Sequence, residues 1–226
     1  MALIAGLAIS SPFEVDFNEK TFTKGIPEDW VVAENPLKKL TFANPPSTVD
    51  EKKVLTILYN NAEKGEYKII YCTNAVSGIE CDNICMKIPV YLAPKLTTQP
   101  SKIDQLQAVI STDGGTSFIG IGEPLNMQEM NRTEGLWVTN TVSAFIDGLS
   151  SHEVLVGLKA IGYGTSLKSG YVGGVSADFV ASATPSEFKF LSGDGDECRE
   201  LDSLLPGEDA ARISVNVPGI PEGRIT

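Results

Sequence analysis

The only histidine of the chain, His152, is the first residue to consider for catalysis. It lies between Ser151 and Glu153, just before a segment of alternating apolar residues. A Ser–His–Asp triad needs its histidine held between a nucleophile and a carboxylate, and the sequence has no G-x-S-x-G motif that would expose a nucleophilic serine. We therefore interpret His152 as a loop residue and predict no catalytic residues.

Two further catalytic patterns give no stronger signal. The segment Gly120-Ile121-Gly122 lacks the third glycine and the following helix of a dinucleotide-binding loop. A glycosidase needs only two carboxylates at a suitable separation, and no pair stands out among the 29 Asp and Glu residues. The chain is therefore predicted to bind or assemble, with a hydrolase as a distant alternative.

The four cysteines, Cys72, Cys81, Cys85 and Cys198, leave three interpretations open. A structural zinc site would need all four thiolates, and only Cys81 and Cys85 have the usual ligand spacing. Two disulfides would allow three pairings. Four thiols buried as small apolar side chains would need no partner. We predict that all four are structural and leave their redox state open.

The charge balance limits the partners of the chain. Eighteen basic and 29 acidic side chains give a net charge of −11 and an isoelectric point near 4.6, so a phosphate backbone would be repelled. No apolar run approaches the roughly 20 residues of a membrane-spanning helix. The apolar residues 1–10 lack the basic start of a signal peptide. We expect a short strand or arm there, no nucleic-acid partner and no membrane insertion.

Apolar residues recur with a period of two, which is typical of strands with one buried face. Between residues 84 and 92 the apolar positions alternate with Cys85, Lys87, Pro89 and Tyr91. Because proline cannot donate to a ladder, Pro89 predicts an edge strand. Strands are predicted at 13–17, 38–43, 52–59, 67–72, 84–92, 106–111, 116–121, 136–147, 154–160, 175–181, 186–191 and 211–217.

Many short strands without alternating helices predict an all-β, antiparallel β-sandwich. We expect an N-terminal strand or arm at 1–10, the sandwich domain at 11–192 and a C-terminal part at 193–226. Within that last part, the spacing of apolar residues from Cys198 to Leu205 predicts one short helix. The segment 218–226 is rich in proline and glycine and predicts an extended tail, suited to lying on a neighbouring subunit.

Three segments, in order, resemble the galactose-binding-like jelly rolls, particularly the cleaved-adhesin type of β-sandwich module. The first is Phe22-x-x-Gly25-Ile26-Pro27-x-x-Trp30, with Asp29 where that group usually has glycine. The second is Ser111-Thr112-Asp113-Gly114-Gly115 with Phe118, and the third is Gly173-Gly174-Val175-Ser176-Ala177-Asp178-Phe179. The resemblance spans about 160 residues and implies a jelly-roll fold with a binding role.

The second segment also fits the Asp-box pattern S-x-D-x-G-x-x-W/F of sialidase propellers. In that box the aspartate bonds turn amides and the aromatic residue packs beneath the turn. Asp113-Gly114 between two apolar strands is itself a hairpin signal. We therefore predict that Asp113 and Gly114 are structural residues that stabilise a turn.

Calcium is the candidate cofactor, and the resemblance is its source. Jelly rolls of this group often bind one ion between the first and last strands, and hard cations take six to eight oxygen ligands. Carried over onto this sequence, the ligands are Glu14 and Asp16 from the first strand and Asp178 from the last. The alternative is that the three carboxylates simply share a solvent face.

Glycan binding needs an exposed aromatic platform, because sugar faces stack on rings. The candidates are Trp30, Tyr91, Trp137, Tyr163 and Tyr171, and each can equally be core or rim packing. We select Trp137, Tyr163 and Tyr171 as the predicted ligand-binding residues.

These observations lead to a non-enzymatic structural or binding protein. Our main prediction is an exposed subunit of a virion (a phage-like capsid decoration, capsid or tail component) that contacts other protein subunits. The absence of catalytic patterns and the extended tail favour it, since such tails join assemblies by strand addition. The alternative is an extracellular or cell-surface carbohydrate-binding or adhesion module that recognises surface glycans.

Overall fold

The computed structural model describes residues 13–33, 40–59, 62–95, 104–130, 134–163, 169–180, 189–192, 197–199 and 212–214. These residues form β-strands and two short 3-10 turns, η1 (Phe17–Glu19) and η2 (Leu149–Ser151). Contacts divide the chain into two compact units, Met1–Ala181 and Ser182–Thr226. In the described ranges, no helix has the length and apolar character needed to cross a membrane.

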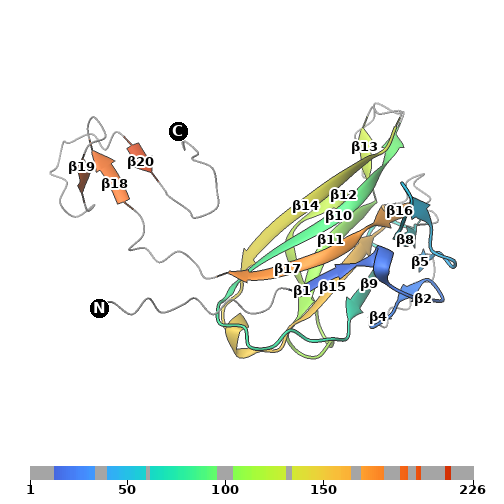
Figure 1. The fold of residues 1–226 in the computed structure, drawn as a ribbon, viewed down its shortest axis with the longest axis horizontal. Coiled ribbons are helices and arrows are strands. Elements are labelled where there is room, and N and C mark those ends of the chain that lie inside the picture. Colours follow the sequence, from blue (N-terminus) through green and yellow to red (C-terminus); the bar gives the residue numbers. More distant parts are fainter. Residues whose placement is uncertain are drawn as a thin grey trace. The chain divides into compact units, whose positions relative to one another are not determined.

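The first unit contains an eight-stranded sheet (Figure 1). Its strands, in spatial order, are β1 (Phe13–Asp16), β17 (Gly174–Val180), β10 (Asn83–Lys95), β16 (Ser169–Val172), β8 (Leu55–Leu58) and β5 (Thr41–Phe42). Two more strands pair with β10: β14 (Leu136–Phe145) and β13 (Gln128–Met130). Among the described strands, β10 and β13 form the one parallel pair.

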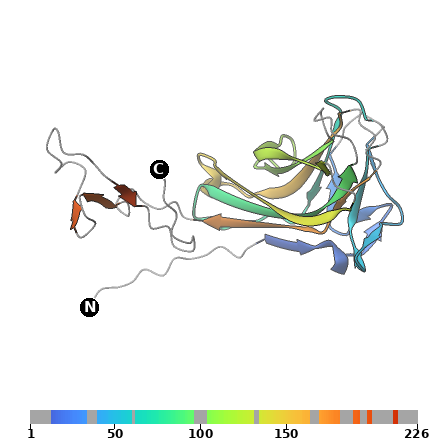
Figure 2. The same cartoon turned by 90° about the horizontal axis from the view of Figure 1, so that it is seen from above.

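A five-stranded antiparallel sheet forms the opposite layer of the same unit (Figure 2). Its order is β12 (Ile119–Asn126), β11 (Gln105–Ser111), β15 (Leu155–Ile161), β9 (Tyr67–Cys72) and β4 (Trp30–Val32). The first unit also contains two separate two-stranded ribbons. One pairs β2 (Phe22–Thr23) with β3 (Ile26–Pro27), and the other pairs β6 (Thr48–Val49) with β7 (Lys52–Lys53).

The core lies between the two sheets, and strand alternation determines which residues enter it. Along β10, Ile84, Met86 and Ile88 are buried while Lys87 is exposed. The five-stranded sheet contributes an equivalent set to the same apolar cluster, which includes Ile70, Leu106, Ile110 and Leu158. Each fully buried aliphatic side chain contributes about 1.5–3 kcal/mol. The predicted all-β antiparallel sandwich is therefore confirmed.

Pro89 does not mark an edge strand, because β10 pairs with β14 on one side and with β16 and β17 on the other. The Pro89 carbonyl accepts the N–H of Gly173, the residue between β16 and β17. In a strand the N–H and C=O of one residue point to the same side. The missing donor therefore faces the break between two strands, where it removes no ladder bond.

In the second unit, β18 (Lys189–Ser192) lies between β19 (Glu197–Arg199) and β20 (Arg212–Ser214). The strand at 189–192 thus pairs with strands of the second unit, although the sequence predicts it within the 11–192 domain. Cys198 and Arg199 belong to β19 and pair with β18, so the prediction that a helix begins at Cys198 is wrong. The rest of that predicted helix, up to Leu205, lies outside the described residues. The arm at 1–10 and the tail at 218–226 also lie outside them.

Candidate ligand-binding groove

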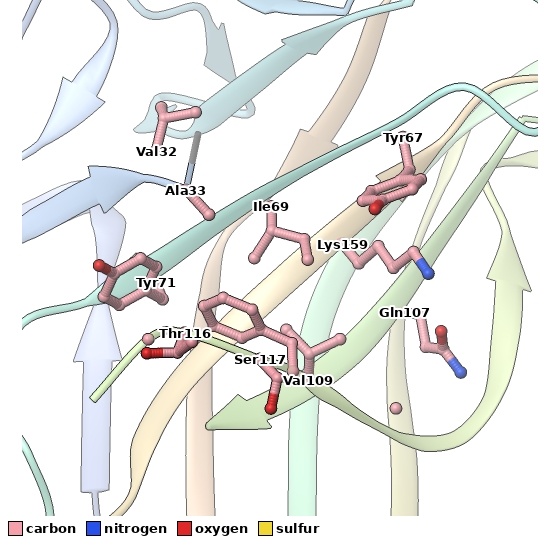
Figure 3. A pocket seen from close by; sticks show the side chains of 13 residues that line it. Val32, Ala33, Tyr67, Ile69, Tyr71, Gln107, Val109, Thr116, Ser117 and Lys159 are labelled. Carbon is pink, nitrogen blue, oxygen red and sulfur yellow. The ribbon is translucent and has the colours of Figure 1, made fainter. Parts of the chain in front are cut away.

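A groove of about 630 Å³ opens on the outer face of the five-stranded sheet (Figure 3). Side chains from β4, β9, β15 and β11 line it, together with the turn between β11 and β12. Ligand sites in proteins commonly have volumes of about 300–1,000 Å³. The groove is therefore large enough for a small molecule or a short stretch of polymer.

Two rows of cross-strand neighbours run beneath the groove. Gln107, Lys159 and Ile69 are paired across β11, β15 and β9, and Val109, Gly157 and Tyr71 form the next row. Directly opposed side chains on one face of a sheet approach within about 5 Å. Gln107 and Lys159 of the first row give the groove a polar end, which Figure 3 shows beside Tyr67.

Gly157 keeps the second row compact. A Cβ at this position would lie 2.8 Å from the carbonyl oxygen of Ile70 and 2.9 Å from the Cβ of Tyr71. A side chain here would push the neighbouring strand and the Tyr71 ring away. The glycine thus allows Val109 and Tyr71 to approach across β15.

The turn at residues 112–118 forms one wall of the groove, and Asp113 stabilises it. Its Oδ1 accepts hydrogen bonds from the Ser111 hydroxyl (2.7 Å) and the Ser117 backbone N–H (2.9 Å), and its Oδ2 accepts from the Ser117 hydroxyl (2.6 Å). These donors, Ser117 first, favour the ionised carboxylate and lower its pKa to about 2. Gly114 supplies the turn with a φ of 70°.

The aromatic residues of the groove are held by the same turn. The rings of Phe118 and Tyr71 pack with centroids 5.2 Å apart. Gly115 approaches Tyr71 so closely that a Cβ there would lie 2.8 Å from its hydroxyl oxygen. Asp113 therefore fixes the turn, and the turn fixes two aromatic rings against the sheet.

Lys159 is the cation of the groove. Its Nζ lies 4.5 Å from the centre of the Tyr67 ring, within the range of a cation–π contact. None of the described residues that line the groove is acidic. The groove therefore combines apolar and aromatic surface with hydroxyl, amide and ammonium groups.

Trp137 and Tyr171, two of the predicted ligand-binding residues, lie on the eight-stranded sheet instead. Tyr91 connects them through edge-to-face contacts, with centroids 5.6 Å from Trp137 and 6.0 Å from Tyr171. The indole N–H of Trp137 donates to Asp50 at 2.7 Å. Trp30 is in the core, packed 5.3 Å from Phe17.

Tyr163, the third predicted residue, is not part of either aromatic group. Its backbone N–H donates to the buried carboxylate of Asp104 at 2.7 Å. The three residues predicted from the sequence are thus not brought into one site with the groove.

The three predicted calcium ligands share the outer face of the eight-stranded sheet, because Glu14 pairs with Ser176 and Asp178 is two residues farther along β17. Asp178 forms a 3.8 Å ion pair with Lys87, and Asp16 accepts from the N–H of Asn18 at 2.8 Å. In the described ranges, no three acidic, histidine or cysteine side chains are grouped to hold a metal. Calcium binding stays a prediction. Comparing the melting temperature with and without a chelator would test it.

Three of the four cysteines can be described. Cys72, Cys81 and Cys85 are free thiols in the structure, and Cys72 is buried. Burial raises the pKa of Cys72 and Cys81, more than the nearby backbone hydrogen bonds lower it. The side chain of Cys198 lies outside the described residues.

The groove residues Tyr67, Tyr71, Phe118, Gln107 and Lys159 were missed at the level of sequence. One signal was available: in β9, Tyr67, Ile69 and Tyr71 alternate with Lys68, Ile70 and Cys72, so both faces are largely apolar. A strand with an aromatic outer face needs something to cover or contact it. The partners of these tyrosines depend on strand register, which the pattern alone does not give.

No family model matches the chain, and no curated protein matches it. Several solved structures are similar. The CBM22-1 xylan-binding domain of Xyn10C from Paenibacillus barcinonensis is 14% identical, with 77% of this chain and 96% of that chain covered and a TM-score of 0.42. The family 29 carbohydrate-binding module CBM29_1 from Piromyces equi is 11% identical, with 76% and 93% covered and a TM-score of 0.41.

The K1 cleaved-adhesin domain of Lys-gingipain from Porphyromonas gingivalis W83 is also similar. It is 10% identical, with 76% of this chain and 99% of that chain covered and a TM-score of 0.44. This is the type of module that the three sequence motifs resemble.

Proposed function

We propose that this β-sandwich is a non-catalytic carbohydrate-binding module and that the groove on its five-stranded sheet receives the glycan. The supporting observation is the composition of the groove, in which aromatic rings adjoin hydroxyl and amide groups along an open sheet face. Sugar rings present apolar C–H faces and polar edges, so they match such a surface. Ligand sites generally combine apolar lining with a few placed polar groups.

The rigidity of the groove supports the same proposal. Its floor belongs to the backbone-paired strands β11, β15 and β9, and its wall is fixed by the hydrogen bonds of Asp113. A preformed site loses little conformational freedom when the ligand binds. Protein groups compete with water for the hydroxyls of a sugar, so a sugar binds more tightly where its hydrogen-bond partners are already in position.

The lining favours binding over hydrolysis. Glycoside hydrolysis requires two carboxyl groups about 5–9.5 Å apart across the scissile bond. The described residues that line the groove include none. The proposal therefore corresponds to the alternative weighed from the sequence, with surface glycans as partners and an extracellular or cell-surface location. The virion-subunit assignment stays a prediction.

A glycan array followed by titration calorimetry on the best ligand would test the proposal. We expect Phe118→Ala and Tyr71→Ala to weaken binding roughly two- to ten-fold, because loss of a stacked ring removes about 0.5–1.5 kcal/mol. Trp137→Ala and Tyr171→Ala, on the other sheet, serve as matched aromatic controls and should bind like the parent.

Thermal melts of all four variants would separate loss of binding from loss of folding. Gln107→Ala provides a milder change on the same floor, should Tyr71→Ala unfold. Binding that depends on Trp137 and not on the groove residues would contradict the groove as the site.

A further inference from the structure

Building on the proposed function, we propose that the groove selects glycans that carry a carboxylate, as uronic acids do, and that Lys159 is the residue that recognises it. The first observation is a contrast of charge. The whole chain carries −11, with 29 acidic and 18 basic side chains. The described lining of the groove nevertheless contains one ammonium group and no carboxylate.

The second observation is the position of Lys159. It lies in the middle strand β15, half-buried, between Gln107 and Ile69 in the polar row of the floor. The contact with Tyr67 holds its Nζ over the ring, so the ammonium has a defined place at one end of the groove. Figure 3 shows the Lys159 side chain extending toward Tyr67 and Gln107.

Within the described ranges, the ion pairs found are Lys20 with Asp29 and Lys87 with Asp178, and neither involves Lys159. An ammonium group that is partly withdrawn from water and has an aromatic neighbour gains most from an anionic partner, since Coulomb attraction strengthens as solvent is excluded. A carboxylate that a ligand brings to this end of the groove meets that requirement.

The number of charges indicates which anionic glycan fits. A densely sulfated polymer carries several charges per disaccharide and needs a cluster of cations, which the groove does not provide among its described residues. Such a polyanion is also repelled by the net charge of −11. A sugar with one carboxylate needs one cation, and its ring still offers a face to Tyr71 and Phe118.

The tests use matched oligosaccharides that differ at C6 of a single sugar: oligomers of glucose, galactose and mannose, and the same oligomers with one residue replaced by glucuronic, galacturonic or mannuronic acid. We expect the acid of the recognised pair to bind about ten-fold more tightly than its neutral counterpart at low salt, which corresponds to about 1.4 kcal/mol, because its carboxylate accepts a charge-assisted hydrogen bond from Lys159. The difference should narrow in high salt, because the groove is open to solvent.

Variants of Lys159 assign the effect to this residue. Lys159→Met keeps the length of the side chain and should bind acid and neutral oligosaccharides equally, whereas Lys159→Arg should retain the preference. Lys52→Met, a surface lysine of β7, is the control for net charge and should behave like the parent.

The possible failures are distinguishable. Equal or tighter binding of the neutral oligosaccharides by the parent protein, or an acid preference that survives Lys159→Met, would overturn the inference and leave glycan binding intact. Binding on the glycan array without binding to any acidic oligosaccharide would overturn the inference alone. Absence of binding to every glycan of the array would reject the proposed function, and the inference with it.

Discussion

Asp113 illustrates how one residue can connect a local turn to the lining of a groove. Its two carboxylate oxygens accept three hydrogen bonds from Ser111 and Ser117, while Phe118, the residue after Ser117, packs on Tyr71. Loss of the carboxylate would release the turn and, through it, the aromatic wall. Asp113 therefore stabilises the turn through its own contacts and the shape of the groove through the turn.

The ionisation of Asp113 gives a prediction for stability against pH. Its pKa is about 2 in the folded chain and about 3.9 in an unfolded one. A depressed folded pKa means that the stabilisation is complete above about pH 4 and is lost as the pH falls through about 2. We expect Asp113→Asn to melt below the parent, with a gap that is largest above pH 4 and closes toward pH 2.

Thermal melts across this pH range would measure the gap, and the difference between the two proteins removes the contribution of other titrating groups. Asp147→Asn, an exposed carboxylate next to η2, is the control. A gap that stays constant with pH would show that the charge on Asp113 is not the source of stability.

At the scale of elements, the groove is a product of strand register. Val109, Gly157 and Tyr71 meet because β11, β15 and β9 pair at those positions. A slip of one residue would turn the side chains of Val109 and Tyr71 into the core. The same alternation of side chains along the strands thus determines the groove on the outer face and the apolar core on the inner face.

Gly157→Ala tests this arrangement. The added methyl group meets the Ile70 carbonyl and the Tyr71 Cβ at less than van der Waals distance, and we expect a loss of about 1–3 kcal/mol in the free energy of unfolding. Ligand affinity should fall as well, because Tyr71 is displaced. Denaturant unfolding and calorimetry measure the two effects.

Ser143→Ala on β14, an exposed outward position, is the control and should change stability by no more than about 0.5 kcal/mol. A Gly157→Ala protein as stable as the parent would mean that the strands separate there without cost.

The strands were predictable from sequence where one face is apolar and the other polar, as in Ile84 to Leu92. Pro89 was misread as an edge residue because nothing in its neighbourhood reveals the break between β16 and β17 that accommodates it. The turn role of Asp113 followed from a local motif. The groove could not be predicted from a local motif, because Lys159, Tyr71 and Phe118 are far apart in sequence and meet only through pairing across the sheet.

At the scale of the whole molecule, the two functions weighed from the sequence make opposite demands. A carbohydrate-binding module can act alone, whereas a particle subunit must contact further copies or other proteins. The described residues form a sandwich whose core is closed within the first unit. On the basis of the proposed function, we expect the protein to act without assembling.

Sedimentation velocity separates these two outcomes. We expect a single species near the 24.2 kDa of the chain, unchanged over a wide range of protein concentration and after addition of an oligosaccharide ligand. A stable higher species in the absence of ligand would favour the virion-subunit prediction, with contact between copies as its basis.

The hairpin at residues 112–118 stands on the sheet without contributing a strand to the floor beneath it. Its geometry is closed by the hydrogen bonds between Asp113 and Ser117, so extra residues inserted between these two positions would separate donor from acceptor and open this wall. The shape of the groove and the stability of the turn are consequently coupled at one loop.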